Sequence, residues 1–403
     1  MNESLAPTLA AAQIRIAAVR PTVYARTRNA LDGAVSGLSP YITHGFVSLS
    51  DVLSGVASRQ TIGVQDKFVF ELGWRAFFRH VWQHRGNAIL RSLHEGPLPD
   101  RAYSRELPVD IRQGCTGVPV IDEAVRTLYV TGTLHNHARM WLASYVVHVR
   151  KVHWRAGADW LYGHLLDGDL ASNHLSWQWV AGTGSSKPYL FNADNVARYA
   201  PASWHSPGSV IDMSYEELND IARQPSPKLQ YRRSATHDPS QLAEPCLGAD
   251  PPTDLGLITP NTAAVSGRDV WLVHPWNLSA LPAQLPADTV VIGVFVADFH
   301  RTWPWSDRRW QFVGSRMAEL ASQCWFGESA TIGAALAGAR RVRSVDEPHL
   351  APWLARWAER RAAPALFPIV DQRCDSFSKW WARATDGVES TADLLAVNEV
   401  QAS

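Results

Sequence analysis

The chain first shows a helical pattern. Apolar residues recur three and four positions apart in three stretches: KFVFELGWRAFFRHVWQHR (67–85), VIDEAVRTLYVTG (120–132) and ARMWLASYVVHVRKVHW (138–154). This spacing puts the apolar side chains on one face and predicts amphipathic helices. Glycine and proline breaks, among them Gly114, Pro119 and Gly132, lie between the stretches. Residues 48–200 therefore predict an all-helical domain.

A different pattern follows in the last third of the chain. Short apolar, β-branched runs at 269–276 and 288–296 predict buried strands. Amphipathic helices are expected at 308–325, 349–361 and 376–384, and further strands at 339–345 and 365–370. Strands that alternate with helices predict a smaller α/β domain with a Rossmann-like parallel sheet.

The pattern also predicts the domain boundaries. Residues 1–220 form the helical domain, and 267–386 form the α/β domain. Between them, 221–266 are rich in Pro, Ser, Asp and Gly, which predicts a linker. Residues 387–403 are expected to be a flexible tail.

Composition narrows the class of protein. The formal net charge is zero, so any phosphate binding must come from a local patch. The four cysteines are far apart and form no C-x-x-C pair, so we expect no metal site and a reducing, cytoplasmic location. The first twenty residues lack the pattern of a signal peptide. No apolar stretch approaches the ~20 residues that span a bilayer, so no membrane contact is expected.

Two motifs in the first eighty residues allow both a structural and a functional interpretation. Glu71, Trp74, Arg75 and Phe78 share one helix face. Taken alone, a core helix with an internal Glu–Arg pair explains them better than a binding site. In SGLSPY, Ser39 is expected to cap a helix that has Pro40 at its first position, although such a terminus also suits phosphate.

The segment LLDGDLASNHLSWQW is harder to explain by structure alone. Asp167 and Asp169 flank a glycine, which is typical of a turn or helix start. Asp169, Asn173 and Trp177 are four apart and form one stripe of a helix. Burying an acid, an amide and an indole in line is costly unless they have partners. A functional interpretation is therefore favoured here.

Six motifs occur in the following order along the chain: SGLSPY, ELGWRAFF, TGVPVIDEAVRTL, HNHARM, WRAG and DGDLASNHLSWQW. With them, the chain resembles the flavin-binding helical domain of the DNA photolyase and cryptochrome family. The resemblance runs from about residue 24 to 189. It implies a helical domain that holds FAD at its centre. The runs after residue 268 weakly resemble the α/β domain that members usually carry first, which implies a permuted order. The resemblance does not indicate if that domain binds a second chromophore that acts as a light-harvesting antenna.

The resemblance also assigns roles to residues. It implies that FAD is bound by Tyr24, Ser36, Ser39, Arg75, Arg139, Asp167, Asp169 and Asn173. It implies electron transfer through Trp177 and Trp154. It implies that a flipped pyrimidine dimer is received by Glu71, Trp74, Asn136, Met140 and Trp179.

The activity that the resemblance implies is a light-driven lyase reaction, in which reduced FAD passes an electron to a UV-induced pyrimidine dimer and splits it. UV-damaged DNA is then the partner, and we expect a monomer. His174-Leu175-Ser176 replaces an Asn-Gly-Gly stretch of the family, and no tryptophan lies between Trp82 and Trp141, where a third electron carrier is usual. Two alternatives therefore stay open: a cryptochrome-like photoreceptor that acts on a protein partner, and a flavoprotein with neither role. Cyclobutane and (6-4) lesions, and single- and double-stranded DNA, are not distinguished.

Overall fold

A computed structural model describes residues 5–225 and 242–402 of the chain. The chain divides into two compact units. Unit 1 contains Met1–Pro21, Ser36–Phe77 and Cys246–Ser403, and unit 2 contains Thr22–Val35 and Phe78–Pro245. The boundary at Phe77 falls within helix α5 (Lys67–Arg85). The boundaries of these units differ from those of the predicted domains, 1–220 and 267–386. The two domains stay a prediction.

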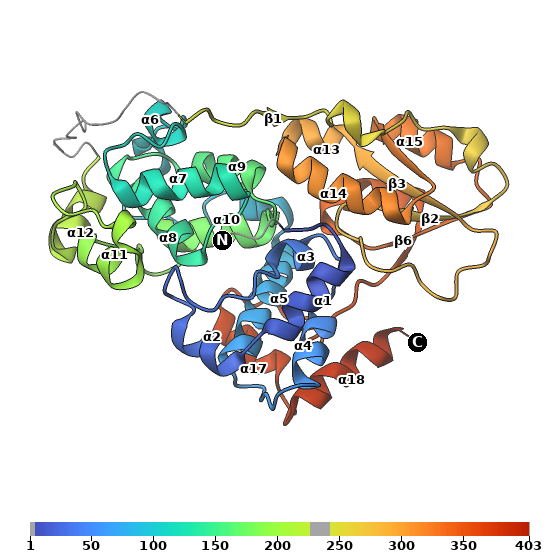
Figure 1. The fold of residues 1–403 in the computed structure, drawn as a ribbon, viewed down its shortest axis with the longest axis horizontal. Helices are drawn as coiled ribbons and strands as arrows, with labels where there is room; N and C mark the ends of the chain where they lie inside the picture. Colours follow the sequence, from blue (N-terminus) through green and yellow to red (C-terminus); the bar gives the residue numbers. More distant parts are fainter. Residues whose placement is uncertain (1–4, 226–241, 403) are drawn as a thin grey trace. The chain divides into compact units, whose positions relative to one another are not determined.

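Unit 2 is helical, as the periodicity predicts. Its described helices, apart from short turns, are α2 (Pro21–Thr27), α6 (Val109–Arg112), α7 (Pro119–Thr131), α8 (Asn136–Ser144), α9 (Trp154–His164), α10 (Leu170–Ala181), α11 (Ala193–Tyr199) and α12 (Tyr215–Arg223). Helices α7 to α10 pack against one another around a core in which Trp141, Trp154 and Trp177 are buried (Figure 1).

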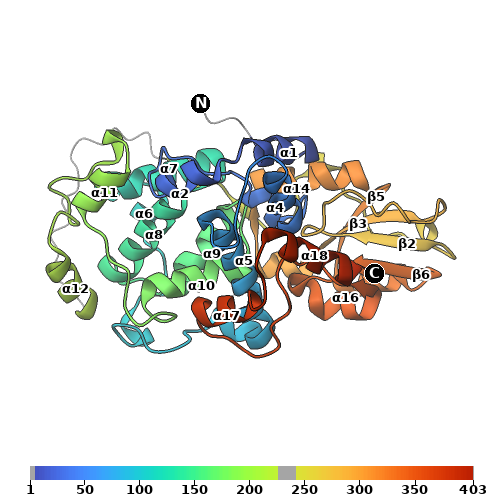
Figure 2. The ribbon, with the colours of Figure 1, turned by 90° about the horizontal axis from the view of Figure 1, so that it is seen from below.

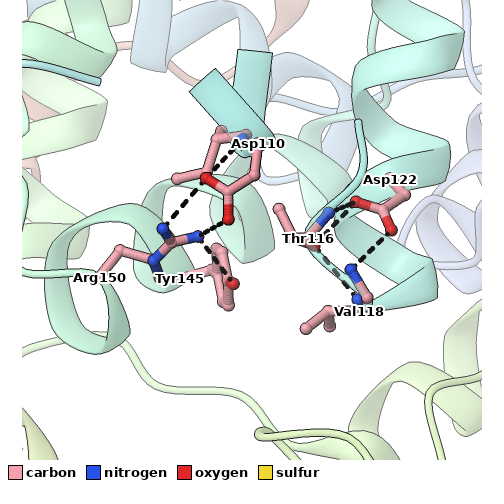
Figure 3. A network of polar contacts seen from close by, with 8 residues as sticks. Asp110, Thr116, Val118, Asp122, Tyr145 and Arg150 are labelled. Atoms are coloured by element: carbon pink, nitrogen blue, oxygen red, sulfur yellow. Dashed lines mark hydrogen bonds and ion pairs between the residues drawn. The ribbon is translucent and has the colours of Figure 1, made fainter. Parts of the chain in front are cut away.

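Helix α7 shows how the sequence sets an element's ends. Pro119 occupies the first turn, where a missing N–H costs nothing. The helix ends at Gly132, whose φ of 67° is left-handed and suits glycine. In the first turn of α7, the buried Asp122 carboxylate accepts hydrogen bonds from the two residues that precede the helix's N-cap. The donors are the Thr116 backbone N–H and hydroxyl and the Gly117 N–H, at 2.7–3.1 Å (Figure 3).

The stretch 138–154 is not the single helix that its periodicity predicts. Helix α8 ends at Ser144 and passes into a π-helical turn, Tyr145–Val149. The chain then breaks at Lys151, which has a φ of 55° and whose ammonium donates to the carbonyls of Ile221 and Ala222 at 2.6 and 3.0 Å. These carbonyls end α12, and a cation there satisfies groups that the helix leaves open. A tertiary contact thus overrides the helical pattern.

A bidentate ion pair fixes the start of this break. Arg150 donates to both carboxylate oxygens of Asp110 at 2.8 and 3.0 Å and to the Tyr145 hydroxyl at 3.3 Å (Figure 3). Parallel bonds of this kind restrict both side chains. Helix α6, which carries Asp110, is therefore tied to the π-helical turn.

Unit 1 contains the predicted α/β arrangement. Five parallel strands pair in the order β5-β3-β2-β6-β7. They are β2 (Asp269–Val273), β3 (Val290–Val296), β5 (Gln323–Gly327), β6 (Arg341–Val345) and β7 (Glu359–Arg361); β1 (Leu247–Gly248) and β4 (Trp305–Ser306) form a separate antiparallel pair. All residues of β2 are buried, and its four apolar residues after Asp269 predict a strand covered on both faces.

Helices cover both faces of this sheet. Figure 2 shows α14 (Asp307–Leu320) and α16 (Ala351–Trp357) on opposite sides of the strands. The other described α-helices of unit 1 are α1 (Leu9–Ala18), α3 (Ser39–Thr43), α4 (Leu49–Ala57), α13 (Ala297–Thr302), α15 (Ser329–Leu336), α17 (Phe377–Ala384) and α18 (Thr391–Ala402). The early helices pack on this layer: the ring of Tyr41 in α3 lies 5.6 Å from that of Phe312 in α14.

Several predictions for this part differ from the structure. The helix expected at 308–325 ends at Leu320, and its last residues belong to β5. The strand expected at 365–370 is absent from the described structure, because Pro368 cannot donate to a ladder and Ile369 points into solvent with 75% of its surface exposed. The expected tail contains α18, which packs on α4 and buries Leu394. Residues 226–241 of the expected linker lie outside the described residues.

Candidate functional site

A partly buried ion pair lies at the centre of the polar segment that the sequence singles out. Arg139, on α8, donates from Nη2 to both carboxylate oxygens of Asp167 at 2.8 and 2.9 Å. Its Nε donates to the Leu134 carbonyl at 2.8 Å. The Asp167 side chain is 5% exposed and that of Arg139 is 26% exposed, so a partly accessible guanidinium stands over a buried carboxylate. The structure thus brings together two of the predicted cofactor residues.

Two more of the predicted cofactor residues, Asp169 and Asn173, lie at the start of α10. Asp169 is the N-cap, and its carboxylate accepts a hydrogen bond from the Ser172 N–H at 2.7 Å. This is the ordinary structural role of an aspartate at a helix start. Asn173 is buried one turn later, and its amide nitrogen donates to the Ala158 carbonyl of α9 at 2.8 Å. The amide therefore has a fixed orientation between two helices.

The two predicted electron carriers also belong to α9 and α10. Trp177 packs on Gly157, where an added Cβ would lie 2.3 Å from the indole ring. Trp154 begins α9, and its Nε1–H donates to the Ser92 hydroxyl at 3.0 Å. Both rings are 2% exposed and belong to one apolar core.

A buried histidine beside them was not predicted as a site residue. His174 is fully buried, and its Nε2 lies 2.8 Å from an Asp159 carboxylate oxygen, while Nδ1 lies 2.9 Å from the Leu170 carbonyl. The two contacts fix the orientation of the ring between α9 and α10. Its edge faces the ring of Trp154 at 6.3 Å. The sequence did contain a sign of this histidine's importance, because His174-Leu175-Ser176 replaces an Asn-Gly-Gly stretch of the family.

Three predicted cavity residues lie in unit 2. Asn136 and Met140 are one turn apart on α8, with the amide nitrogen 3.6 Å from the thioether sulfur. Trp179, on α10, is 41% exposed and packs obliquely on the ring of Tyr189 at 5.6 Å. An indole left this exposed at the surface of a unit can stack on a ligand.

Unit 1 carries Glu71, Trp74 and Arg75 on α5. Glu71 pairs with Lys67 one turn earlier at 3.1 Å, and Arg75 reaches the Thr43 hydroxyl at 3.5 Å.

Trp74 has a partner that the sequence did not indicate. Its ring stacks on Phe377 of α17, with centroids 4.1 Å apart and planes 13° apart. Phe70 and Phe77 of α5 also contact Phe377, at 4.5 and 5.7 Å. The two helices are about 300 residues apart in the sequence, so no local pattern links them. The sequence shows only that SFSKWW, at the start of the second helix, is rich in aromatic residues. One face of Trp74 is therefore covered by this chain itself.

The remaining predicted residues lie on short segments. The Tyr24 carbonyl accepts the Arg28 N–H at the end of α2, and the Ser36 hydroxyl accepts the Leu38 N–H at 3.4 Å. Ser39 is the first residue of α3 and not its cap; Leu38 holds that position and makes no side-chain cap bond. The capping prediction for Ser39 is therefore wrong, because the helix begins one residue earlier than Pro40 suggests. Tyr24 belongs to unit 2, and both serines to unit 1.

Comparison with known proteins identifies the helical region. Residues 68–221 match the FAD binding domain of DNA photolyase. The deoxyribodipyrimidine photo-lyase of Streptomyces griseus is 38% identical over 153 residues, which are 38% of this chain and 33% of that protein. Through this region the chain is similar to members of the photolyase and cryptochrome family.

Relatives from both branches of the family match. The Cryptochrome DASH, chloroplastic/mitochondrial, of Ostreococcus tauri is 31% identical over 260 residues, 62% of this chain and 44% of that protein. A solved cryptochrome from Synechocystis sp. PCC6803 is 28% identical, with a TM-score of 0.43 over 49% of this chain and 45% of that one. The chain thus spans less than half the length of these relatives.

The family domain that residues 68–221 match binds FAD. The donor set in unit 2 suits it: a partly accessible guanidinium, a buried carboxylate and a buried amide can hydrogen-bond the polar edge of a flavin ring. The described residues contain no group of three or more His, Cys, Asp and Glu placed for a metal ion. Among the same residues, no helix is long and apolar enough to cross a membrane.

Proposed function

We propose that this protein is a light-driven, FAD-dependent enzyme of photolyase type, which splits UV-induced pyrimidine dimers in DNA. The observation that carries the proposal is the partly buried Arg139–Asp167 pair, with the Asn173 amide held in a fixed orientation, inside a region that matches the photolyase FAD-binding domain. When bound and reduced, FAD supplies an electron that light makes available and takes it back after the dimer opens.

The residues of unit 2 hold the flavin edge. Arg139 offers N–H donors, and Asp167 keeps its guanidinium oriented through two bonds from one nitrogen. Asp169 would hydrogen-bond the ring edge of a bound flavin, and Asn173 would stand beside the ring nitrogen that takes up a proton on reduction. Because Asn173 already donates to Ala158, its amide oxygen is directed by the same bond. These groups bind and orient; none has to act as a titrating base.

A second group binds the phosphates of the cofactor. We assign Tyr24, Ser36, Ser39 and Arg75 to them, with Arg75 as the cation. Hydroxyl and guanidinium donors are the groups that phosphate oxygens accept bonds from most readily.

The lesion is received by Glu71, Trp74, Asn136, Met140 and Trp179. A dimer must leave the stacked duplex to be reached, and damaged bases are the easiest to unstack. Trp74 and Trp179 offer flat apolar faces for the dimer, while Glu71 and Asn136 offer hydrogen bonds to its polar edge. DNA binding through arginines predicts an affinity that falls as salt rises.

The wider organisation is part of the proposal. Residues 1–220 act as the FAD-binding helical domain and 267–386 as an α/β domain in permuted order, linked by 221–266. Trp177 and Trp154 carry electrons to an oxidised flavin. We propose a cytoplasmic monomer, because the four cysteines are scattered along the sequence and form no C-x-x-C pair, which suits a reducing compartment.

A second candidate is a photoreceptor of cryptochrome type. The match to the Ostreococcus tauri cryptochrome covers more of this chain than the Streptomyces griseus match does. In that case light would change the flavin redox state and a protein partner would respond to it.

One experiment separates the two. The purified protein is examined for the visible spectrum of bound flavin, reduced chemically, and illuminated with an oligonucleotide that contains a thymine dimer. Recovery of thymine absorbance in the light, but not in the dark, supports repair. Bound flavin that is reduced by light without any recovery supports the photoreceptor. Protein that is colourless and takes up no FAD refutes both.

A further inference from the structure

An oxidised Trp154 needs a donor closer to solvent. Trp154 is 2% exposed, so a dissolved reductant cannot reach it. No tryptophan lies between Trp82 and Trp141 to supply the electron. The described ring contacts of Trp154 are to two histidines, His153 at 5.6 Å and His174 at 6.3 Å. Beyond His153, at 6.3 Å, lies the ring of Tyr103.

The backbone fixes Tyr103 at this place. The residue after it, Ser104, forms a parallel bridge with Val152: its N–H donates to the Lys151 carbonyl, and its carbonyl accepts the His153 N–H, each at 2.8 Å. His153 immediately precedes Trp154, the first residue of α9. Tyr103 is therefore held by main-chain bonds beside the start of the helix that carries the indole.

Side chains reinforce the arrangement. Ser92, which accepts the Trp154 Nε1–H, donates to both Asp100 oxygens at 3.0 and 3.1 Å. The same carboxylate lies 3.3 Å from His153 Nε2, while His153 Nδ1 accepts the Arg155 N–H at 3.1 Å. One aspartate thus ties together the indole and the imidazole that lie between the core and Tyr103.

The position of Tyr103 suits the end of an electron route. It packs against the core that contains Trp154 and Trp177, yet its side chain is partly exposed. Burial raises the pKa of its phenol to about 12, a backbone hydrogen bond at Leu98 opposes the rise and the Asp100 charge adds to it. The phenol is therefore neutral near pH 7, and its oxidation must release a proton. Water at its exposed side can take that proton.

We infer that Tyr103 is the terminal electron donor for light-driven reduction of the flavin, in place of a third tryptophan. The inference rests on the proposed function, which supplies the oxidant, a light-excited oxidised flavin. One electron passes from Trp177 to the flavin and one from Trp154 to Trp177. Tyr103 then gives one electron to Trp154 and its phenolic proton to water, so both indoles return to their neutral form and a neutral tyrosyl radical is left. An external reductant restores the phenol.

The test uses the full chain with oxidised FAD bound, illuminated without DNA. In wild type, electron paramagnetic resonance and transient absorption are expected to detect a tyrosyl radical. Tyr103→Phe should lose this signal and most of the light-driven flavin reduction. Tyr103→Trp should restore the reduction with a tryptophanyl radical in its place. Heavy water should slow formation of the wild-type radical but not that of the tryptophan variant.

Tyr199→Phe is the matched control, because Tyr199 packs on the same core but contacts His137. Flavin content and thermal unfolding midpoints of all variants are compared first, so that a folding defect is recognised. A tyrosyl radical and reduction that persist in Tyr103→Phe would overturn the inference. Dimer repair by chemically reduced wild type bypasses the route and tests the proposed function separately.

Discussion

At the scale of single residues, the Arg139–Asp167 pair decides how the polar segment is read. Replacing an ion pair by apolar residues is often harmless, whereas removing one partner leaves an uncompensated charge. Here the guanidinium is the exposed partner and the carboxylate the buried one. The carboxylate therefore serves to hold a donor in place.

Asp167→Asn is expected to weaken FAD binding about 10- to 100-fold, the equivalent of a charged hydrogen bond worth about 1.5–3 kcal/mol. The amide keeps the shape but leaves the Arg139 charge without its partner. Flavin retained per protein after dialysis, and titration with FAD, measure the change. Glu123→Gln is the control, since it breaks an exposed pair with Arg126 on α7. Equal flavin affinity in D167N and wild type would show that the pair is only structural.

Gly157→Ala is expected to destabilise the protein by ~1–3 kcal/mol, the usual effect of overpacking a core. The new Cβ would lie 2.3 Å from the Trp177 ring, so the indole must move. The free-energy cost of moving it is expected to exceed the ~1 kcal/mol by which alanine stabilises a helix relative to glycine. Denaturant unfolding and tryptophan fluorescence measure it. Gly63→Ala is the comparison, because its Cβ would meet only Asp66 at 3.7 Å. A G157A variant as stable as wild type would mean that Trp177 has room to shift.

At the scale of elements, the contact of α5 with α17 is the main feature that local pattern could not reveal. Gly73 of α5 lies against Trp381, where an added Cβ would be 2.4 Å from the ring. The stack of Trp74 on Phe377 is one part of a continuous aromatic contact.

A double-mutant cycle of Trp74→Ala and Phe377→Ala is expected to give a coupling of about 0.5–1.5 kcal/mol in the free energy of unfolding, the range for an aromatic pair. Ile369→Ala, at an exposed site, should be additive with Trp74→Ala. Additivity of the Trp74 and Phe377 changes would contradict the stacked geometry.

The sequence predicted the elements whose pattern is local. Helix α5 has the predicted bounds, and α7, β2 and β3 lie within a few residues of theirs. The π-helical turn after α8 was not predictable, because it depends on Lys151 reaching the end of α12. The same limit applies to the site. The Arg139–Asp167 pair followed from motifs, whereas Tyr103 and Phe377 depend on contacts across the sequence.

At the scale of the whole molecule, buried titratable groups link stability to pH. His148 is 1% exposed; its Nε2 lies 2.9 Å from the Val180 carbonyl, and its Nδ1 has no hydrogen-bond partner within the described part of the chain. Burial lowers the pKa of His148 from 6.5 to about 4, the Val180 bond opposes this, and the Lys151 charge adds to it.

The folded protein is expected to lose stability as pH falls from 6.5 towards 4. In this window the unfolded chain binds a proton at His148 and the folded chain does not, so unfolding is favoured by up to about 3 kcal/mol at the acid end. Above pH 6.5 the contribution of His148 to the free energy of unfolding no longer changes with pH. Urea unfolding at several pH values measures the slope, and His148→Gln should reduce it. Part of the slope should stay, because burial also lowers the pKa of His135 to about 4. An unchanged slope in H148Q would exclude this origin.

The division into units has a consequence for synthesis. Unit 1 joins residues from both parts of the chain: His44 Nδ1 lies 2.7 Å from the Pro275 carbonyl, and Ile62 accepts the Thr391 hydroxyl. The helices of Ser36–Phe77 therefore leave the ribosome long before the strands on which they pack. Phe78–Pro245, with its own core, emerges in between. The nascent polypeptide is therefore expected to complete the Phe78–Pro245 core first, while Ser36–Phe77 waits until the residues after Cys246 have been synthesised.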